Sequence, residues 1–192
     1  FVLGDKSEIL KQHIKGSDYV IQEPQLGTGH AVKIAGTRIN DLNSIILIAY
    51  ADTPFISPKT IKKIIRQIEN GCKISILGFE TDRPNGYGRI IKNHSNHVLE
   101  IIEDRDADDE VKKIKLCNSG ILAGKAKDIL DYLDQVKLSN SGEYYLTDIV
   151  SICANNKSKV GLVLGSFEEL IGVNDRMDLS NAEKIIQKKL KN

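Results

Sequence analysis

Short apolar runs alternate along this chain with segments whose apolar residues recur at helical spacing. Residues 45–51 are apolar throughout, which predicts a central strand covered on both faces. Such alternation favours an α/β architecture. Further strands are expected at residues 19–21, 73–79, 115–123 and 160–164, and further helices around residues 126–133, 147–153 and 182–190.

The helix with the clearest signals follows residue 57. Ser57 can cap it, and Pro58 suits its first position. The stripe predicted to be buried is Ile61, Ile64, Ile65 and Ile68. Gly71 is expected to be the left-handed residue beyond the C-terminus. Downstream, residues 88–91 and 97–103 predict an antiparallel hairpin, and Thr147 is a candidate helix cap.

Composition narrows the class of protein. The chain has 192 residues and a formal net charge of +1, so no global field favours nucleic acid or an anionic membrane. No stretch has the length and apolarity of a membrane span. Cys72, Cys117 and Cys153 are widely spaced, which predicts buried free thiols in a reducing cytosol.

Residues 22–31 place two glycines around a threonine, directly before a helical pattern. Glycine allows a ligand to approach the backbone, and a helix start offers N–H groups to negative charge. This pattern predicts a site for a nucleotide or a phosphorylated sugar, the alternative being a plain strand-to-helix turn. Asp52 follows the most apolar strand, where ligands bind in open α/β sheets. It is either a ligand of a divalent cation or a cap of the turn into Pro54.

Several motifs occur in a fixed order along nearly the whole chain. They are Gln22 with Leu26-Gly27-Thr28-Gly29-His30-Ala31, Tyr50-Ala51-Asp52-Thr53-Pro54, Gly86-Tyr87-Gly88-Arg89-Ile90, Ile102-Glu103 with Asp106-Ala107, Asn118-Ser119-Gly120-Ile121, Gly142-Glu143-Tyr144-Tyr145-Leu146-Thr147-Asp148 and Gly172-Val173-Asn174-Asp175-Arg176. Together they resemble the N-terminal pyrophosphorylase part of the bacterial bifunctional N-acetylglucosamine-1-phosphate uridyltransferase / glucosamine-1-phosphate acetyltransferase family.

The resemblance implies a fold and a reaction. The expected fold is the Rossmann-like fold of nucleotide-diphospho-sugar transferases, with a mixed, mostly parallel central sheet flanked by helices. The expected reaction converts UTP and N-acetylglucosamine 1-phosphate into UDP-N-acetylglucosamine and pyrophosphate, for cell-envelope precursors in the cytoplasm. Mg²⁺ is the implied cofactor, and no nucleic acid or membrane partner is expected.

The resemblance also assigns residues. Gln22 and Gly27 match positions that read uracil, and Asp52 and Asn174 match the two metal ligands. The positions that hold the N-acetylglucosamine moiety correspond to Thr28, Tyr50, Gly88, Glu103 and Asn118, and Ala51 lies beside Asp52 in the substrate site. His30 is interpreted as structural, and the motif at residues 144–148 receives no catalytic role.

This sequence departs from the family pattern in four places. Ala51 stands where the family often has glycine, and Ser119 replaces a threonine, both mild changes. Neither the family's glycine-rich L-x-A-G-x-G-T-x-M loop nor its hexapeptide-repeat β-helix has a match. Residues 1–192 are therefore expected to be a single partial domain of a longer polypeptide, whose parent protein is expected to be a trimer. Two alternatives remain: a nucleotidylyltransferase for another base or sugar, and a non-catalytic module that binds nucleotide sugars.

Overall fold

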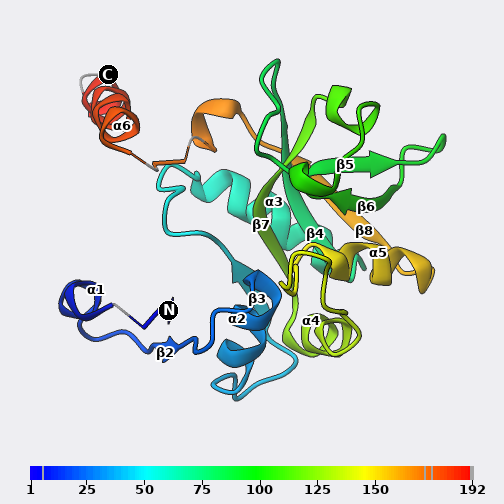
Figure 1. Cartoon of the computed structure of the whole chain (residues 1–192), viewed down its shortest axis with the longest axis horizontal. Helices are drawn as coiled ribbons and strands as arrows, with labels where there is room; N and C mark the ends of the chain where they lie inside the picture. The colour runs from blue at the N-terminus through cyan, green and yellow to red at the C-terminus, as the bar shows by residue number, and fades with distance from the viewer. Residues whose placement is uncertain (6, 171, 174, 191–192) are drawn as a thin grey trace.

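The computed structural model has three layers, with a mixed β-sheet between helices (Figure 1). It describes residues 1–5, 7–170, 172–173 and 175–190, and side chains only as far as residue 187. The strands are β1 (Val2–Leu3), β2 (Val20–Ile21), β3 (Ile45–Ile48), β4 (Ile74–Glu80), β5 (Arg89–Lys92), β6 (Val98–Ile102), β7 (Leu116–Lys125) and β8 (Val160–Leu164). The α-helices are α1 (Glu8–His13), α2 (Thr28–Gly36), α3 (Pro58–Glu69), α4 (Ala126–Leu133), α5 (Asp148–Asn155) and α6 (Arg176–Leu190).

The main sheet has the strand order β6-β5-β7-β4-β8, and β3 also pairs with β7. The prediction of a mostly parallel sheet is wrong, because the long strand β7 runs antiparallel to its neighbours β3, β4 and β5. The hairpin of β5 and β6 is antiparallel too, as predicted. Within this sheet, the parallel pairing that the structure describes joins β4 to β8.

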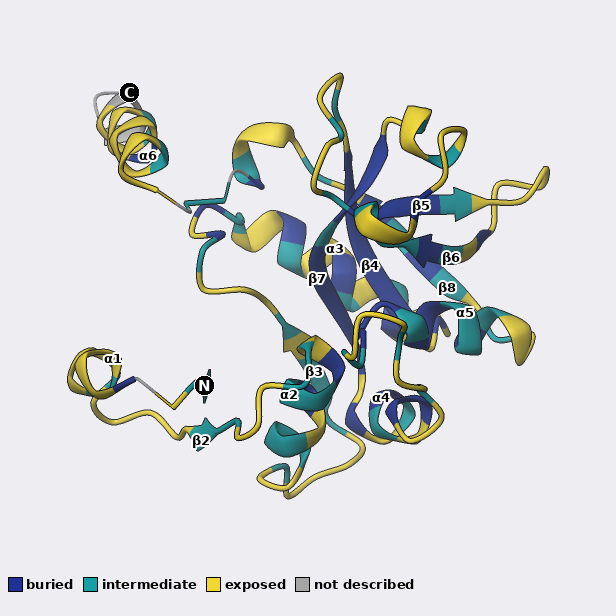
Figure 2. Ribbon diagram, in the orientation of Figure 1, coloured by how far each residue is buried: buried dark blue, intermediate teal, exposed yellow. Residues whose placement is uncertain are grey.

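Apolar side chains fill both faces of this sheet. Helix α3 covers one face, where Ile64 and Ile68 pack with Leu77 and Phe79 of β4. Helices α4 and α5 cover the other face, where Ile129 and Ile149 pack with a set of apolar residues that includes Ile74, Ile76 and Leu122. The predicted boundaries of α3 are confirmed, since Ser57 Oγ accepts from Thr60 N and Gly71 has a φ of 91°. Figure 2 shows β4 and β7 as the buried centre of the molecule.

Strand β3 departs from its prediction. The apolar run at 45–51 predicts a strand covered on both faces, but the strand ends at Ile48 and Leu47 is 36% exposed. One edge of β3 pairs with residues 122–125 of β7. Across the described part of the chain, no strand pairs with its other edge. An apolar run predicts a buried strand, but burial depends on which elements pack around that strand. Within the described residues, β3 has a neighbouring strand along one edge only.

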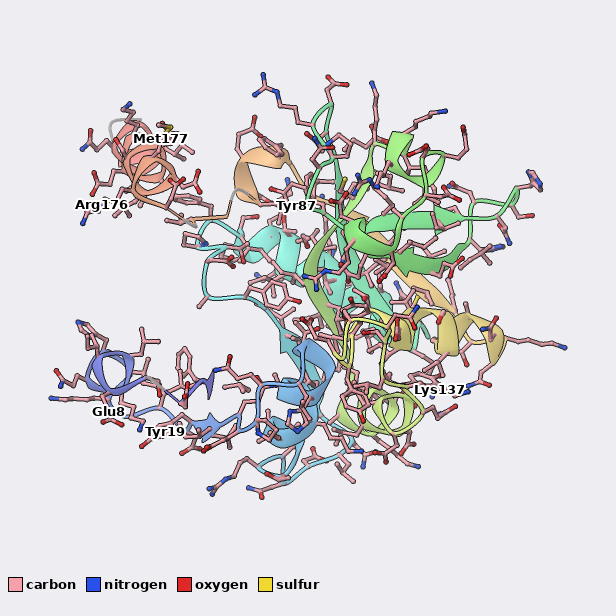
Figure 3. The ribbon with its side chains drawn as sticks, in the orientation of Figure 1. Glu8, Tyr19, Tyr87, Lys137, Arg176 and Met177 are labelled. Atoms are coloured by element: carbon pink, nitrogen blue, oxygen red, sulfur yellow. The ribbon has the colours of Figure 1, made fainter. Side chains whose placement is uncertain are left out.

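The two ends of the chain lie away from the main sheet (Figure 1). Strands β1 and β2 form a separate parallel pair, and α1 has no buried residue. Figure 3 shows Met177 on α6 far from the sheet, and its side chain is 74% exposed. The helix predicted around residues 182–190 is present as part of α6 but is only partly covered, since Ala182 is buried while Ile186 is 45% exposed. None of the described helices combines the length and apolarity needed to cross a bilayer.

The thiol prediction is confirmed as far as burial goes. Cys72, Cys117 and Cys153 are free and buried. Burial raises the pKa of each thiol above its usual value, so these side chains pack as small apolar groups.

Candidate functional site

Five of the predicted site residues surround one hollow beside β3, β5 and β7. Tyr50, Asp52, Gly88, Glu103 and Asn118 all line a cavity of about 240 Å³. Its other lining residues are Thr53, Gly86, Tyr87, Ser119, Gly120, Leu170 and Gly172. Pockets for whole drug-sized ligands measure about 300–1,000 Å³. This cavity is therefore large enough for only part of such a ligand.

Gly88 and Asn118 hold one wall of this cavity together through the backbone. Asn118 N donates to Gly88 O at 2.8 Å, and Asn118 is 8% exposed. A Cβ on Gly88 would lie 2.9 Å from Ile101 Cγ2 and 3.3 Å from Glu103 Oε2. Glycine is therefore needed here because β6 and the Glu103 carboxylate approach the chain closely.

Arg89 anchors the same wall from inside the protein. Its side chain is 0% exposed, and Nη2 lies 2.9 Å from Asp104 Oδ1. Its Nη1 donates to Tyr87 O. Partial burial raises the pKa of Asp104, but hydrogen bonding from the Gly86 backbone and the pairing with Arg89 outweigh it, and the pKa is lowered. The pair of the buried Arg89 guanidinium with the partly exposed Asp104 carboxylate ties the loop at 86–88 to the turn after Glu103.

Glu103 is positioned by a residue of a distant segment. Thr147 Oγ1 donates to Glu103 Oε1 at 2.7 Å, and Thr147 is 5% exposed. Thr147 does occupy the N-cap position of α5, but its side chain makes no capping bond. Its hydroxyl is oriented towards Glu103 instead. Asp148 follows, and burial together with the negative charge of Glu103 raises its pKa.

Tyr50 links the cavity to the turn at Thr28. A Cβ on Gly120 would lie 2.1 Å from Tyr50 Cε2, and Gly120 has a φ of 80°. Gly120 therefore makes room for the Tyr50 ring, a role that the sequence motif did not reveal. Burial and the charge of Glu103 raise the pKa of Tyr50, and a hydrogen bond with Thr28 opposes that rise.

Gly27 and Gly29, on either side of Thr28, lie close to the backbone at Tyr144. A Cβ on Gly27 would lie 2.7 Å from Tyr144 O, and a Cβ on Gly29 would lie 3.0 Å from the same atom. Gly29 N donates to Tyr144 O, Tyr144 N donates to Leu26 O, both at 2.8 Å, and Leu146 N donates to Thr28 Oγ1 at 3.0 Å. We call residues 143–147 the strap. The strap therefore packs closely against Gly27 and Gly29 on the side where a Cβ would lie.

Of the remaining predicted residues, Gln22 lies beside this turn. Gln22 Nε2 donates to Gly27 O at 2.9 Å, so these two positions are in direct contact. Ala51 is exposed between Tyr50 and Asp52. Asn174 lies outside the described residues.

The carboxylate of Asp52 is the candidate ligand for a cation. Its Oδ1 is buried and has no hydrogen-bond partner among the described residues. Its backbone carbonyl accepts from Val173 N at 2.8 Å, which brings Val173 next to Asp52. A buried carboxylate oxygen without a donor is costly unless a cation or water meets it. The residues present therefore fit a divalent cation, although the described residues contain no cluster of three or more metal-binding His, Cys, Asp or Glu side chains.

A larger cavity lies elsewhere, between α2 and α4. It has a volume of about 570 Å³ and contains none of the predicted site residues. Its lining includes His30, the Lys33–Asp134 ion pair and apolar side chains such as Ile34 and Leu133. The motif at 26–31 therefore has two sides, one towards Tyr50 and one towards this cavity.

Comparison with known proteins places this geometry in context. The chain is 39% identical to the bifunctional protein GlmU of Streptococcus uberis over 193 aligned positions, which cover 98% of this chain and 42% of that protein. It is 41% identical to GlmU of Caldanaerobacter subterraneus, with 95% of this chain and 40% of that protein covered. The chain thus spans about two fifths of the length of these curated relatives.

Solved structures support the fold. A UDP-glucose pyrophosphorylase complexed with UDP-glucose superposes with a TM-score of 0.70 and 18% identity, covering 95% of this chain and 80% of that one. At this identity the match concerns the fold alone. No family model matches the chain.

Proposed function

We propose that this chain, a relative of the GlmU proteins over nearly its whole length, is the uridyltransferase part of such an enzyme. It would join UTP and N-acetylglucosamine 1-phosphate into UDP-N-acetylglucosamine and release pyrophosphate. The observation that carries the proposal is the convergence of Tyr50, Asp52, Gly88, Glu103 and Asn118 on one cavity. A nucleotidyltransferase with sugar-phosphate substrates is the broader class to which the relatives and the fold point.

The proposed reaction needs positioning more than covalent chemistry. A phosphate oxygen of the sugar 1-phosphate attacks the α-phosphorus of UTP in line. The bond from the α-phosphorus to the bridging oxygen breaks, and pyrophosphate leaves with the electron pair. Phosphoryl-type transfers of this kind are accelerated chiefly by alignment and by neutralisation of charge. No protein nucleophile is required.

The sugar would lie between Glu103 and Asn118. Glu103 Oε1 already accepts from Thr147, which leaves the carboxylate with further lone pairs for sugar hydroxyls. The Asn118 amide can both donate and accept. Gly88 allows the sugar to contact the backbone, and Tyr50 and Thr28 would complete the site for the N-acetylglucosamine moiety.

Asp52 and Asn174 would hold a magnesium ion beside the phosphates. The orphaned Oδ1 of Asp52 supports its part in this assignment. When bound, Mg²⁺ neutralises phosphate charge and polarises the phosphorus under attack. Ala51 would leave the approach to Asp52 unobstructed, since a methyl group is its entire side chain. On the other side of the site, Gln22 and Gly27 would meet the uracil ring.

The test measures pyrophosphate release from UTP and N-acetylglucosamine 1-phosphate with Mg²⁺. It uses the polypeptide encoded by the complete gene, its Asp52→Ala variant and the control Asp134→Ala, whose exposed carboxylate pairs with Lys33 between α2 and α4, outside the candidate site. We expect release by the parent and the control, and a fall of about 10²-fold or more in Asp52→Ala.

Two outcomes would overturn the proposal. If the parent releases no pyrophosphate yet binds UDP-N-acetylglucosamine, the chain is a non-catalytic module for nucleotide sugars. If another base or sugar is turned over faster, the chain is a nucleotidylyltransferase of different specificity. Full activity of Asp52→Ala would remove Asp52 from the metal site.

A further inference from the structure

Gln22 and His30 contact each other through their side chains. Gln22 Nε2 lies 3.2 Å from His30 Nδ1 and 2.9 Å from Gly27 O. Gln22 directly follows β2 and His30 lies in the first turn of α2, and both residues are partly buried. His30 thus reaches the residue that the proposed function assigns to base recognition.

The two contacts determine which end of the Gln22 amide faces which way. A backbone carbonyl only accepts hydrogen bonds, so Gly27 O must face the amide nitrogen and not the amide oxygen. The same nitrogen carries a second hydrogen, and His30 Nδ1 is within reach of it. His30 must then be the tautomer with a bare Nδ1 and its proton on Nε2.

One hydrogen bond alone would leave the amide free to swing. The last torsion of a glutamine side chain is broad, so the carbonyl oxygen could rotate while the nitrogen stays near Gly27. Two acceptors on one NH₂ group define the plane of the amide. Among the described residues, none donates a hydrogen bond to Gln22 Oε1, which is therefore the amide atom left to meet a ligand.

We propose that His30 is a positioning residue that fixes the Gln22 amide with its oxygen towards the base, and thereby selects bases with an imide N–H. This inference rests on the proposed function. Uracil and thymine carry a hydrogen on N3 that can be donated to Oε1. Cytosine has a bare, electron-rich N3, which would face the Gln22 oxygen acceptor to acceptor. The structure thus gives His30 a role in specificity, where the sequence suggested a structural one.

The test measures kcat/KM for UTP, CTP and dTTP with N-acetylglucosamine 1-phosphate. It compares the complete polypeptide with His30→Leu, His30→Asn and His30→Gln. An asparagine can place an oxygen acceptor where Nδ1 lies, whereas a glutamine places its polar group further out. We expect the UTP to CTP ratio to fall about tenfold in His30→Leu and His30→Gln, and to stay near the parent value in His30→Asn. The UTP to dTTP ratio should not change, because both bases carry the imide hydrogen.

A double-mutant cycle tests whether His30 acts through Gln22. Gln22→Leu removes the amide, so adding His30→Leu to it should not lower the UTP to CTP ratio further. Thr37→Val is the control, because Thr37 lines the same cavity as His30 and its hydroxyl donates within its own helix to Ile34 O. It should leave all ratios unchanged.

The outcomes separate this inference from the function on which it rests. If the parent prefers UTP but every His30 variant keeps the UTP to CTP ratio, His30 is structural and the inference is overturned. Equal losses of kcat/KM with UTP and with CTP would also overturn the inference, because their ratio would then be unchanged. If the parent forms no product with any nucleotide, the proposed function fails, and this inference fails with it.

Discussion

The two sides of the candidate site are built in different ways. The sugar side, which we define as Gly88, Glu103 and Asn118, lies beside the β5–β6 hairpin and on β7, next to the fully buried Arg89. The base side, which we define as Gln22 and Gly27, lies on partly exposed chain. The base side is held by backbone contacts with the strap. One side depends on the core, and the other depends on a segment far away in sequence.

On the sugar side, the largest effect is expected when the carboxylate partner of Arg89 is removed. Asp104→Ala should destabilise the protein by about 3 kcal/mol, because it strands a buried guanidinium. Urea unfolding measures this. The control Asp82→Ala breaks an exposed pair with Lys115 and should cause no measurable loss. Equal effects of the two substitutions would contradict the buried-pair interpretation.

The same pair predicts a pH dependence. The folded state lowers the pKa of Asp104 below its usual 3.8, so its stabilising contribution is present above that value. It is lost as the pH falls through the lowered pKa, where the carboxylate becomes protonated. The stability difference between the parent and Asp104→Ala should therefore shrink below pH 3.8. A difference that grows in acid would reverse the sign and refute this assignment.

Gly27→Ala attacks the base side. Gly27 has a φ of 97°, and an added Cβ would lie 2.7 Å from Tyr144 O, so we expect a loss of about 2 kcal/mol. Hydrogen exchange should rise in residues 26–30 and 143–147 together. Gly142→Ala is the matched control, since Gly142 has a φ of 81° but nothing lies within 4 Å of its Cβ position. Unlinked exchange of the two segments would argue against the strap.

These contrasts show what the sequence could predict. Local signals sufficed for α3, because Ser57, Pro58 and Gly71 act on the backbone beside them. Local signals failed for β3, whose apolar run says nothing about which edges find partners. The site followed from ordered motifs, and the structure brings Asp52, Glu103 and Asn118 to one cavity. The contact of Gly27 with Tyr144 could not be predicted, because the two residues lie more than a hundred positions apart in the chain. The bond from Thr147 to Glu103 could not be predicted because it depends on the direction of the Thr147 side chain.

Thr147→Val tests the link between the two sides. It removes the donor to Glu103 Oε1. We expect the free energy of unfolding to fall by about 1 kcal/mol and the KM for the sugar phosphate to rise about fivefold. Thr147→Ser keeps the hydroxyl and should restore the KM. Steady-state kinetics with UTP held in excess measures both. A KM that stays the same in Thr147→Val would mean that Glu103 needs no positioning from the strap.

The smallest effect is expected at the exposed pair between α2 and α4. Lys33 Nζ lies 2.7 Å from Asp134 Oδ1, with side chains 56% and 68% exposed. Lys33→Met should change the free energy of unfolding by no more than about 0.5 kcal/mol, and less in high salt. A larger loss, measured by urea unfolding, would show that the base side depends on α4 as well as on the strap.

The contact between the strap and Thr28 also sets an order of events during synthesis. Leu146 and Thr28 are 118 residues apart in the chain. A ribosome adds about 5–20 residues per second, so roughly 6–24 s pass between the appearance of the turn and that of its partner. The Gly27–Gly29 turn therefore emerges well before the backbone that completes it. The base side is finished only after the strands and helices in between have been made.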